Sequence, residues 1–378
     1  MTDIIPQVDP LAGYLERREA IDYAVGGALG SGRYILGERV DAFEWTFAAR
    51  FGGGECVSVA NGTDAVELAL RGLGVGPGDL VFAPSHTSVA TVAAIGRCGA
   101  APALVDCDPI HAVIDPQSLA AALVAAQDGR AGRPAAVVAV HLYGHPAPMP
   151  ELLALASAHG LPVIEDCAQA HGALLHGRPV GTWGAAGAFS FYPTKNLGAF
   201  GDGGAVLTAD PAMAGRIRAL RQYGWDDTRN SRIPGLNSRL DELQAAILLV
   251  RLAGFDEDQA RRHAIADRYT LGLGQLVDIP QIATGAVHAW HQYVIQSDDR
   301  EGLRRHLATL GVQTAIHYPL PVHLQDAYRD RIALAPGGLP NTEALCRRIL
   351  SLPLFPQLRP DQVDRVIEGI TRWSGIAV

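Results

Sequence analysis

Lysine is almost absent from this chain of 378 residues. Lysine and arginine together number 31, and Lys195 is the only lysine, so arginine accounts for the other 30. Arginine can replace lysine wherever a solvated positive charge is enough, but a guanidinium stays protonated and cannot form a Schiff base. Lys195 is therefore a candidate for amine chemistry, although chance alone can also leave one lysine in a chain so rich in arginine.

Other absences exclude whole classes of protein. Acidic residues outnumber basic ones by 39 to 31, a net charge of −8, which argues against a general binder of nucleic acid or anionic membranes. No apolar run reaches the length of a membrane span, and the segment MTDIIPQVDP has none of the parts of a signal peptide, so we expect a cytoplasmic protein. The five cysteines form no C-x-x-C pair, which indicates buried thiols in a reducing compartment.

Short apolar runs alternate with helical patterns up to about residue 240. Seven runs are typical of strands, at residues 56–60, 80–83, 103–106, 136–141, 162–166, 187–191 and 205–208. Helical patterns lie between the earlier ones, at residues 64–71, 89–98, 116–126 and 151–159. This alternation predicts an α/β fold with a mostly parallel seven-stranded sheet.

A smaller α+β unit is predicted after this sheet. One long amphipathic helix is expected over residues 241–269, and Ser238 with Asp241 resembles a capping box at its start. A strand near residues 291–296 and helices near 300–310 and 361–373 follow. We place the boundary inside the long helix, with a large domain at residues 1–245 and a small domain at residues 246–378.

Three segments near strand ends together fit the needs of pyridoxal 5′-phosphate (PLP). This cofactor needs a lysine for its aldehyde, a carboxylate for its ring nitrogen, and backbone N–H groups with hydroxyls for its phosphate. Lys195 and Asp166 are candidates for the first two roles, and Gly62, Thr63 and Ser190 for the third. Each has an ordinary alternative when taken alone, because an aspartate often caps a turn and a Gly-Thr pair often follows a plain helix cap.

Longer motifs are more specific than these single residues. They are EDCAQAHGA at 165–173, AFSFYPTKNLGAFGDGGAV at 188–206 and GLNSRLDELQAA at 235–246. Together they resemble the sugar aminotransferases of the DegT/DnrJ/EryC1/StrS family, and further matching pieces extend the likeness over nearly the whole chain. The resemblance implies a fold-type-I PLP transferase, which is usually a homodimer with active sites shared between the subunits.

The resemblance also implies a role for each matching residue. Lys195 would bind the cofactor aldehyde and move a proton, and Asp166 would pair with the ring nitrogen. Ala168 would lie against one ring face and Gln169 near the ring hydroxyl. The phosphate would be held by Gly62, Thr63, Asp64 and Ser190, with Asn237 from the partner subunit.

One position departs from the family pattern. Many members have an aromatic residue where this chain has Ser88, so His86 or Tyr192 would cover that ring face, or no aromatic ring does. His317 and Tyr318 lie in a segment that faces the substrate in the family, and Tyr192 is a further substrate candidate.

Charged and metal-binding patterns add little to these assignments. Arg229 belongs to an arginine cluster that would attract a diphosphate, with a solvated loop as the alternative. No histidine spacing fits a zinc site, and the aromatic neighbours of His291 and His317 indicate packing or substrate contact, so we expect no metal.

The resemblance implies transfer of an amino group, from glutamate, to a keto group of a nucleotide-diphosphate-linked hexose. The motifs are closer to members that act at carbon 3 of a deoxyhexose, in the biosynthesis of deoxyamino sugars and polysaccharides such as O-antigen, and carbon 4 is the alternative. A regulator or ligand sensor without turnover is a second alternative. Sugar dehydratases of the same fold have histidine in place of lysine, so Lys195 speaks against them. Neither nucleic acid nor a membrane is expected as a partner.

Overall fold

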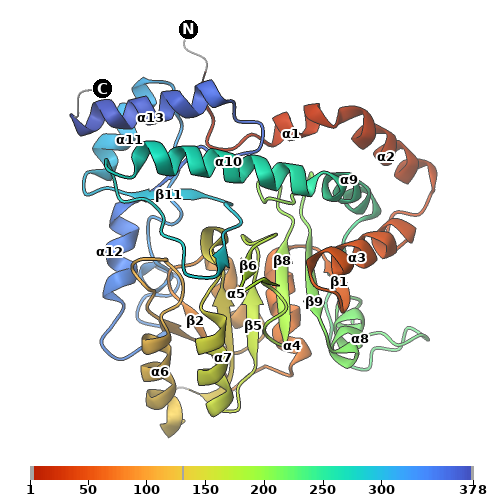
Figure 1. The fold of residues 1–378 in the computed structure, drawn as a ribbon. Coiled ribbons are helices and arrows are strands. Elements are labelled where there is room, and N and C mark those ends of the chain that lie inside the picture. Colours follow the sequence, from red (N-terminus) through yellow and green to blue (C-terminus); the bar gives the residue numbers. More distant parts are fainter. Residues whose placement is uncertain (1–3, 130–131, 376–378) are drawn as a thin grey trace.

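A large, mostly parallel sheet forms the centre of the molecule (Figure 1). The computed structural model describes residues 4–129 and 132–375, and within them the sheet has eight strands in the order β1-β9-β8-β5-β4-β2-β3-β12. They are β1 (Glu55–Val59), β2 (Asp79–Pro84), β3 (Ala101–Val105), β4 (Arg133–Val140), β5 (Val163–Asp166), β8 (Ala186–Ser190), β9 (Gly204–Thr208) and β12 (Ala333–Leu334). Only β9 runs antiparallel to its two neighbours, β1 and β8.

The predicted α/β fold is confirmed, and the number of strands is corrected. Each of the seven predicted strands lies in this sheet, because parallel strands covered on both faces are continuous apolar runs. The eighth strand, β12, pairs with β3 and has only two residues, Ala333 and Leu334. A strand this short shows no periodicity, so the prediction of seven strands was wrong at this edge.

Two smaller sheets complete the strands that the structure describes. One consists of β6 (Leu174–Leu175), β7 (Arg178–Pro179) and β10 (Ala286–Val287), and the other of β11 (Tyr293–Gln296) and β13 (Ile349–Leu352). The pair β11–β13 belongs to the C-terminal part of the chain, where β11 confirms the strand expected near residues 291–296.

Helices surround the main sheet and the C-terminal pair of strands. Those before β9 are α1 (Pro10–Glu16), α2 (Arg18–Gly30), α3 (Glu38–Phe51), α4 (Gly62–Gly72), α5 (Val89–Arg97), α6 (Pro116–Ala125) and α7 (Met149–Ala158). Those after it are α8 (Pro211–Leu220), α9 (Glu242–Ala253), α10 (Phe255–Leu273), α11 (Arg300–Thr309), α12 (Pro340–Arg348) and α13 (Pro360–Ser374). Short 3-10 turns lie at η1 (Ala126–Asp128), η2 (Leu142–Gly144) and η3 (Val322–Leu324). Figure 1 shows α10 crossing one end of the sheet, beside α13.

The single long helix expected over residues 241–269 is in fact two helices. α9 ends and α10 begins at Gly254, where a side chain would have its Cβ 2.5 Å from the guanidinium of Arg17. Arg17 lies there because it pairs with the buried carboxylate of Asp258 at 2.7 Å. The expected capping box is also wrong, because the Ser238 hydroxyl donates to Asp64 at 2.6 Å instead of capping the helix.

Three apolar clusters pack around these elements. Two of them combine strands of the main sheet with its covering helices. The third joins Ile5 to residues of α10, α11, β13 and α13 around Tyr269 and Tyr293. The division into domains at residue 245 stays a prediction. All five cysteines are free and buried, as expected. In the part of the chain that the structure describes, no helix combines the length and the apolar character that a membrane crossing requires.

Candidate active site

A cavity of about 360 Å³ lies where the carboxyl ends of β4, β5 and β8 meet the first turns of α4 and α5. Open α/β sheets bind ligands at this end of their strands, because loops rather than side-chain layers cover it. The predicted site residues that line the cavity are Gly62, Thr63, Asp166, Ala168, Gln169, Ser190, Tyr192, Lys195, His317 and Tyr318. Segments far apart in the sequence therefore meet in one cavity.

Lys195 lies on a turn that leaves β8 and returns to β9. Its backbone N–H donates to the carbonyl of Tyr192 at 2.8 Å, which closes the turn. Burial lowers the pKa of the Lys195 amine to about 8, and the nearby carboxylate of Asp166 opposes this shift. Among the described residues the amine has no hydrogen-bond partner. An amine with this pKa can both give up and take back a proton near neutral pH.

Asp166 ends β5 and is 6% exposed. One carboxylate oxygen accepts from the backbone N–H of Ala168 at 3.1 Å, and the other accepts from the Thr91 hydroxyl at 2.8 Å. The Thr91 oxygen is itself 3.0 Å from the hydroxyl of Thr87. Because the Thr91 proton goes to the carboxylate, Thr87 is the donor in that second bond. The sequence analysis missed both threonines.

The first turn of α4 presents unused backbone donors to the cavity. Asn61 caps the helix, and its side chain accepts from the backbone N–H of Asp64 at 2.8 Å. Within the described chain, the N–H groups of Gly62 and Thr63 have no acceptor, as expected at a helix start. A Cβ at Gly62 would lie 2.5 Å from the Cβ of Ser190, so only glycine allows the helix end to come this close to the serine.

The side chain of Asp64 faces away from the cavity. It accepts from the Ser238 hydroxyl and pairs with Arg97 at 3.0 Å. Neither contact was expected from the sequence. Asn61, by contrast, lines the cavity and was not among the predicted residues.

Gln169 joins two parts of the cavity wall. Its side-chain oxygen accepts from the backbone N–H of Tyr143 at 2.7 Å, and its side-chain nitrogen donates to the Tyr318 hydroxyl at 3.1 Å. Tyr143 in turn donates from its hydroxyl to the backbone carbonyl of His317. Burial raises the pKa of Tyr318, so its hydroxyl stays protonated near neutral pH. These bonds hold the segment that contains His317 and Tyr318 against the end of β5.

Besides Asp64, three predicted residues do not line the cavity. His86 is buried behind it, with one ring nitrogen 2.9 Å from the Tyr143 hydroxyl, and burial lowers its pKa to about 4. Asn237 is exposed on this chain, on a segment that follows α8. Arg229 is also exposed, and its guanidinium carbon lies 5.8 Å from the centre of the Trp225 ring. In contrast, His291 and Gln292 line the cavity although no role had been assigned to them.

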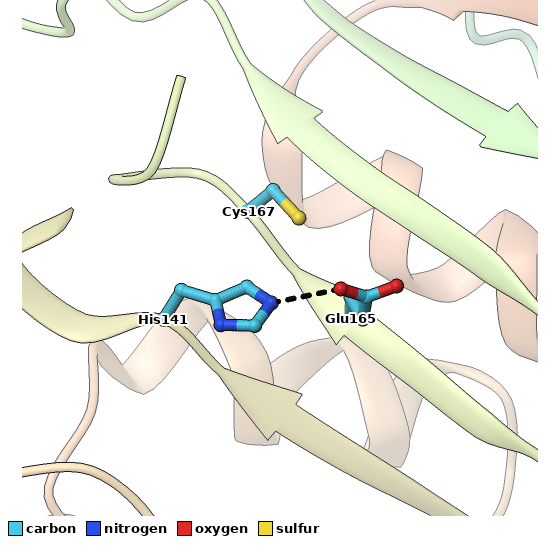
Figure 2. Close-up of side chains that lie close together, drawn as sticks. All are labelled: His141, Glu165 and Cys167. Atoms are coloured by element: carbon cyan, nitrogen blue, oxygen red, sulfur yellow. Dashed lines mark hydrogen bonds and ion pairs between the residues drawn. The ribbon is translucent and has the colours of Figure 1, made fainter. Parts of the chain in front are cut away.

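A second cluster of polar side chains lies on the other face of β5. Figure 2 shows His141, Glu165 and Cys167, whose potential ligand atoms lie within 4.8 Å of one another. His141 bonds to Glu165 at 3.0 Å through Nε2, and its Nδ1 accepts from the backbone N–H of Ala147. The Glu165 carboxylate also accepts three backbone N–H groups of the loop at residues 181–184. Because the ring nitrogens of His141 and the oxygens of Glu165 are already engaged in hydrogen bonds, the cluster is explained as a structural one.

Comparisons with known proteins give matches that extend over nearly the whole chain. The sequence model of the DegT/DnrJ/EryC1/StrS aminotransferase family matches residues 16–371. The dTDP-3-amino-3,4,6-trideoxy-alpha-D-glucose transaminase of Streptomyces venezuelae is 44% identical over 99% of this chain and 97% of its own. The erythromycin biosynthesis sensory transduction protein EryC1 of Saccharopolyspora erythraea is 47% identical over 96% of this chain and 98% of its own.

A solved structure shows the same fold with a cofactor bound. The structure of NtdA from Bacillus subtilis with bound cofactor PMP is 28% identical to this chain and has a TM-score of 0.86. The match covers 95% of this chain and 82% of that one.

Proposed function

Since the chain belongs to the DegT/DnrJ/EryC1/StrS family and is an aminotransferase, we propose that it uses PLP to aminate carbon 3 of a nucleotide-linked keto sugar. The observation that carries this proposal is the position of Lys195. The only lysine of the chain lines the same cavity as Asp166 and the start of α4. The Streptomyces venezuelae relative, whose name specifies carbon 3, supports the position on the sugar.

The described residues fit PLP at each point where it needs a contact. The free N–H groups of Gly62 and Thr63, with the hydroxyls of Thr63 and Ser190, would hold its phosphate at the positive end of the α4 dipole. Asp166 would hold the ring nitrogen, and Gln169 would lie near the ring hydroxyl. When bound, PLP supplies an aldehyde for the amine and a ring that withdraws electrons from the reacting carbon.

The protein's own residues then supply proton transfer and orientation. Lys195 Nζ would take a proton from the substrate carbon and deliver it to the aldehyde carbon of the cofactor, which requires a pKa close to the working pH, and burial brings that pKa to about 8. Thr91 and the Ala168 N–H hold the Asp166 carboxylate in one orientation. Tyr318, His317 and Tyr192 line the cavity, and we propose that they contact the sugar.

We propose glutamate as the amino donor, which the family resemblance implies, and a homodimer as the working assembly. Asn237 supports a dimer, because the residue proposed to reach the phosphate lies outside the cavity of its own chain. Exposed aromatic side chains near the N-terminus also support it, with Tyr23 at 86% and Trp45 at 75% exposure. Sedimentation velocity tests the dimer, and a monomer at assay concentrations contradicts it.

Borohydride reduction of the PLP-loaded protein, followed by peptide mapping, tests the cofactor proposal. The peptide that contains Lys195 should carry the mass of the reduced cofactor. If that peptide is unmodified while PLP is bound elsewhere, the proposal is wrong. A protein reduced in the same way without PLP is the control, since it has the same peptides and no cofactor.

A sensor without turnover is the second candidate, because the name of the EryC1 relative describes sensory transduction. The two functions predict different behaviour with glutamate. A transaminase loaded with PLP loses its yellow colour when glutamate is added and regains it when a 3-keto nucleotide sugar follows. A sensor binds the sugar without either change.

A further inference from the structure

His291 is a buried residue of the cavity wall that the mechanism above does not use. It is 4% exposed, precedes β11 and lines the same cavity as Lys195. Its backbone N–H donates to the carbonyl of Tyr143 at 3.0 Å, so the main chain at this position is held against the turn that follows β4. The ring therefore has a defined place in the cavity that the single lysine also lines.

The neighbours of His291 determine which ring nitrogen carries the proton. The side-chain nitrogen of Asn196 donates to the backbone carbonyl of Ala289 at 2.7 Å. A carbonyl can only accept, so the other end of the Asn196 amide is its oxygen. This oxygen lies 3.2 Å from Nδ1 of His291, and Nδ1 must therefore be the donor.

The second ring nitrogen is consequently an acceptor. Burial, with the charge of Lys195 as the next cause, holds the pKa of His291 well below its usual value, so the ring is neutral. A neutral ring with its proton on Nδ1 has a lone pair on Nε2. Among the residues that the structure describes, neither Nε2 of His291 nor the amine of Lys195 has a hydrogen-bond partner, and both residues line the cavity.

We propose that the Lys195 side chain, whose amine has no hydrogen-bond partner among the described residues, turns to donate to Nε2 of His291 when the amine is charged and carries no cofactor, and that Asn196 is the positioning residue that selects the required tautomer. The lysine stem is flexible and its ammonium has three donors, so it can reach an acceptor in the same cavity. Asn196 follows Lys195 directly in the sequence, which links the tautomer to the turn that carries the amine.

This hydrogen bond has a definite electrostatic consequence. An acceptor that bonds to the ammonium favours the charged form and raises the pKa of Lys195, whereas burial lowers it. The charged and titratable groups around the pair are Asp166, Asp202, Arg262, His171, His317, Tyr192 and Tyr318. They stay unchanged when only His291 is replaced, so a change in the lysine pKa reports on His291.

The single lysine makes the measurement direct. In full-length protein without cofactor, labelled with 13C at the lysine Cε, one side-chain NMR signal titrates with the amine of Lys195. Burial and Asp166 without His291 give a pKa of about 8, so we expect a higher value for the unmodified sequence, where His291 adds an acceptor. Because no cofactor or substrate is present, the result does not depend on the proposed transaminase function, and the two can fail separately.

Two amide substitutions separate the two ring nitrogens. His291→Asn places an amide where Nδ1 lies and removes the acceptor at Nε2, and it should lower the lysine pKa by about one unit, a tenfold change in the proton equilibrium. His291→Gln places an amide where Nε2 lies and should keep the pKa within about 0.3 units of the starting value. Equal values for His291→Asn and the unmodified sequence overturn the proposal. An equal fall in both variants also overturns it, because the effect would then come from ring packing.

Two further variants provide a second measurement and a matched control. Asn196→Ala leaves His291 in place but removes the acceptor of its Nδ1 proton, so the ring can adopt either tautomer. This variant should lower the pKa of Lys195 by less than His291→Asn does. An unchanged pKa of Lys195 contradicts the role of Asn196. The Asn196→Ala variant also supplies a measurement if His291→Asn does not fold. The matched control is His306→Asn on α11, where the ring bonds to the Gly369 carbonyl at 3.0 Å and lies outside the cavity. This control should leave the lysine signal unchanged.

Discussion

Glu165 and Asp166 are neighbouring carboxylates on β5 with opposite surroundings. Successive side chains of a strand point to opposite faces, so Glu165 lies in the cluster with His141 while Asp166 lines the cavity. Glu165 is completely buried and accepts hydrogen bonds from His141 and from the backbone N–H groups of Gly181, Trp183 and Gly184. From the described residues, Asp166 accepts only two hydrogen bonds, donated by Thr91 and Ala168.

This difference shows how one chemical group takes two roles. The Glu165 carboxylate is engaged by four donors, so it fixes the loop at residues 181–184 to the sheet. Asp166 keeps acceptor capacity that faces the cavity, where a cationic group can use it. The thiol of Cys167, on the Glu165 side, has its pKa raised by burial and then by Glu165 and Asp166, which keeps it protonated. The open side is therefore the one that we propose as reactive.

We expect the largest loss of activity for substitution of Lys195, which lines the cavity on the open side of β5, the face that carries Asp166. Lys195→Ala should lower the rate of amino transfer by about 10⁴-fold, because the variant loses both the attachment point of the cofactor and the acid–base group. Single-turnover absorbance with glutamate measures this loss. Lys195→Arg is the control for charge, and it should be as inactive as the alanine variant. An active arginine variant contradicts the role of the amine.

Asp166→Asn removes the charge on the open side and keeps the shape. We expect the transfer rate to fall by about 10²–10³-fold, the size of effect found when a single charge-stabilising group is removed from an active site. The free energy of unfolding in urea should change by less than about 1 kcal/mol, because two hydrogen bonds are affected at most. A normal rate with lowered stability would mean that Asp166 has the structural role instead.

Glu165→Gln makes the same change from carboxylate to amide one residue away, on the opposite face of β5, where Glu165 is completely buried. An amide has one oxygen, so some of the four donors lose their acceptor, and stability should fall by about 3 kcal/mol. The rate per folded molecule should stay within about threefold of the starting value. Urea unfolding and active-site titration with PLP separate the two quantities. A lost rate without lost stability would place Glu165 in the chemistry.

Thr91→Val sharpens the comparison by removing one of the two donors to Asp166. The change keeps the shape of the side chain and should reduce kcat/KM by about fivefold, equivalent to one hydrogen bond of about 1 kcal/mol. Steady-state kinetics measure it. Thr46→Val on α3 is the matched control, since its hydroxyl bonds only to the carbonyl of Ala42 at the exposed surface. Equal kinetics in both variants would show that Thr91 does not support Asp166.

Parts of the site that depend on local sequence were predictable. Asp166 ends an apolar run, and Gly62 with Thr63 follows another, so their place at strand and helix ends could be inferred without a structure. Contacts with residues far away in the sequence were not predictable. Thr91 bonds to a residue 75 positions away, and Asp64 is drawn to Ser238, which lies 174 positions away. Both threonine and aspartate have local uses, so neither residue by itself indicates such a partner.

The sequence by itself determined which seven segments are strands of the main sheet and which residue carries the one side-chain amine, because apolar runs and residue types are local properties. Only the tertiary structure decided which side of β5 is open, that the helix is interrupted at Gly254, and that His291 lines the same cavity as Lys195. These features arise where side chains from remote segments compete for the same space and the same hydrogen-bond donors, and a linear sequence does not display that competition.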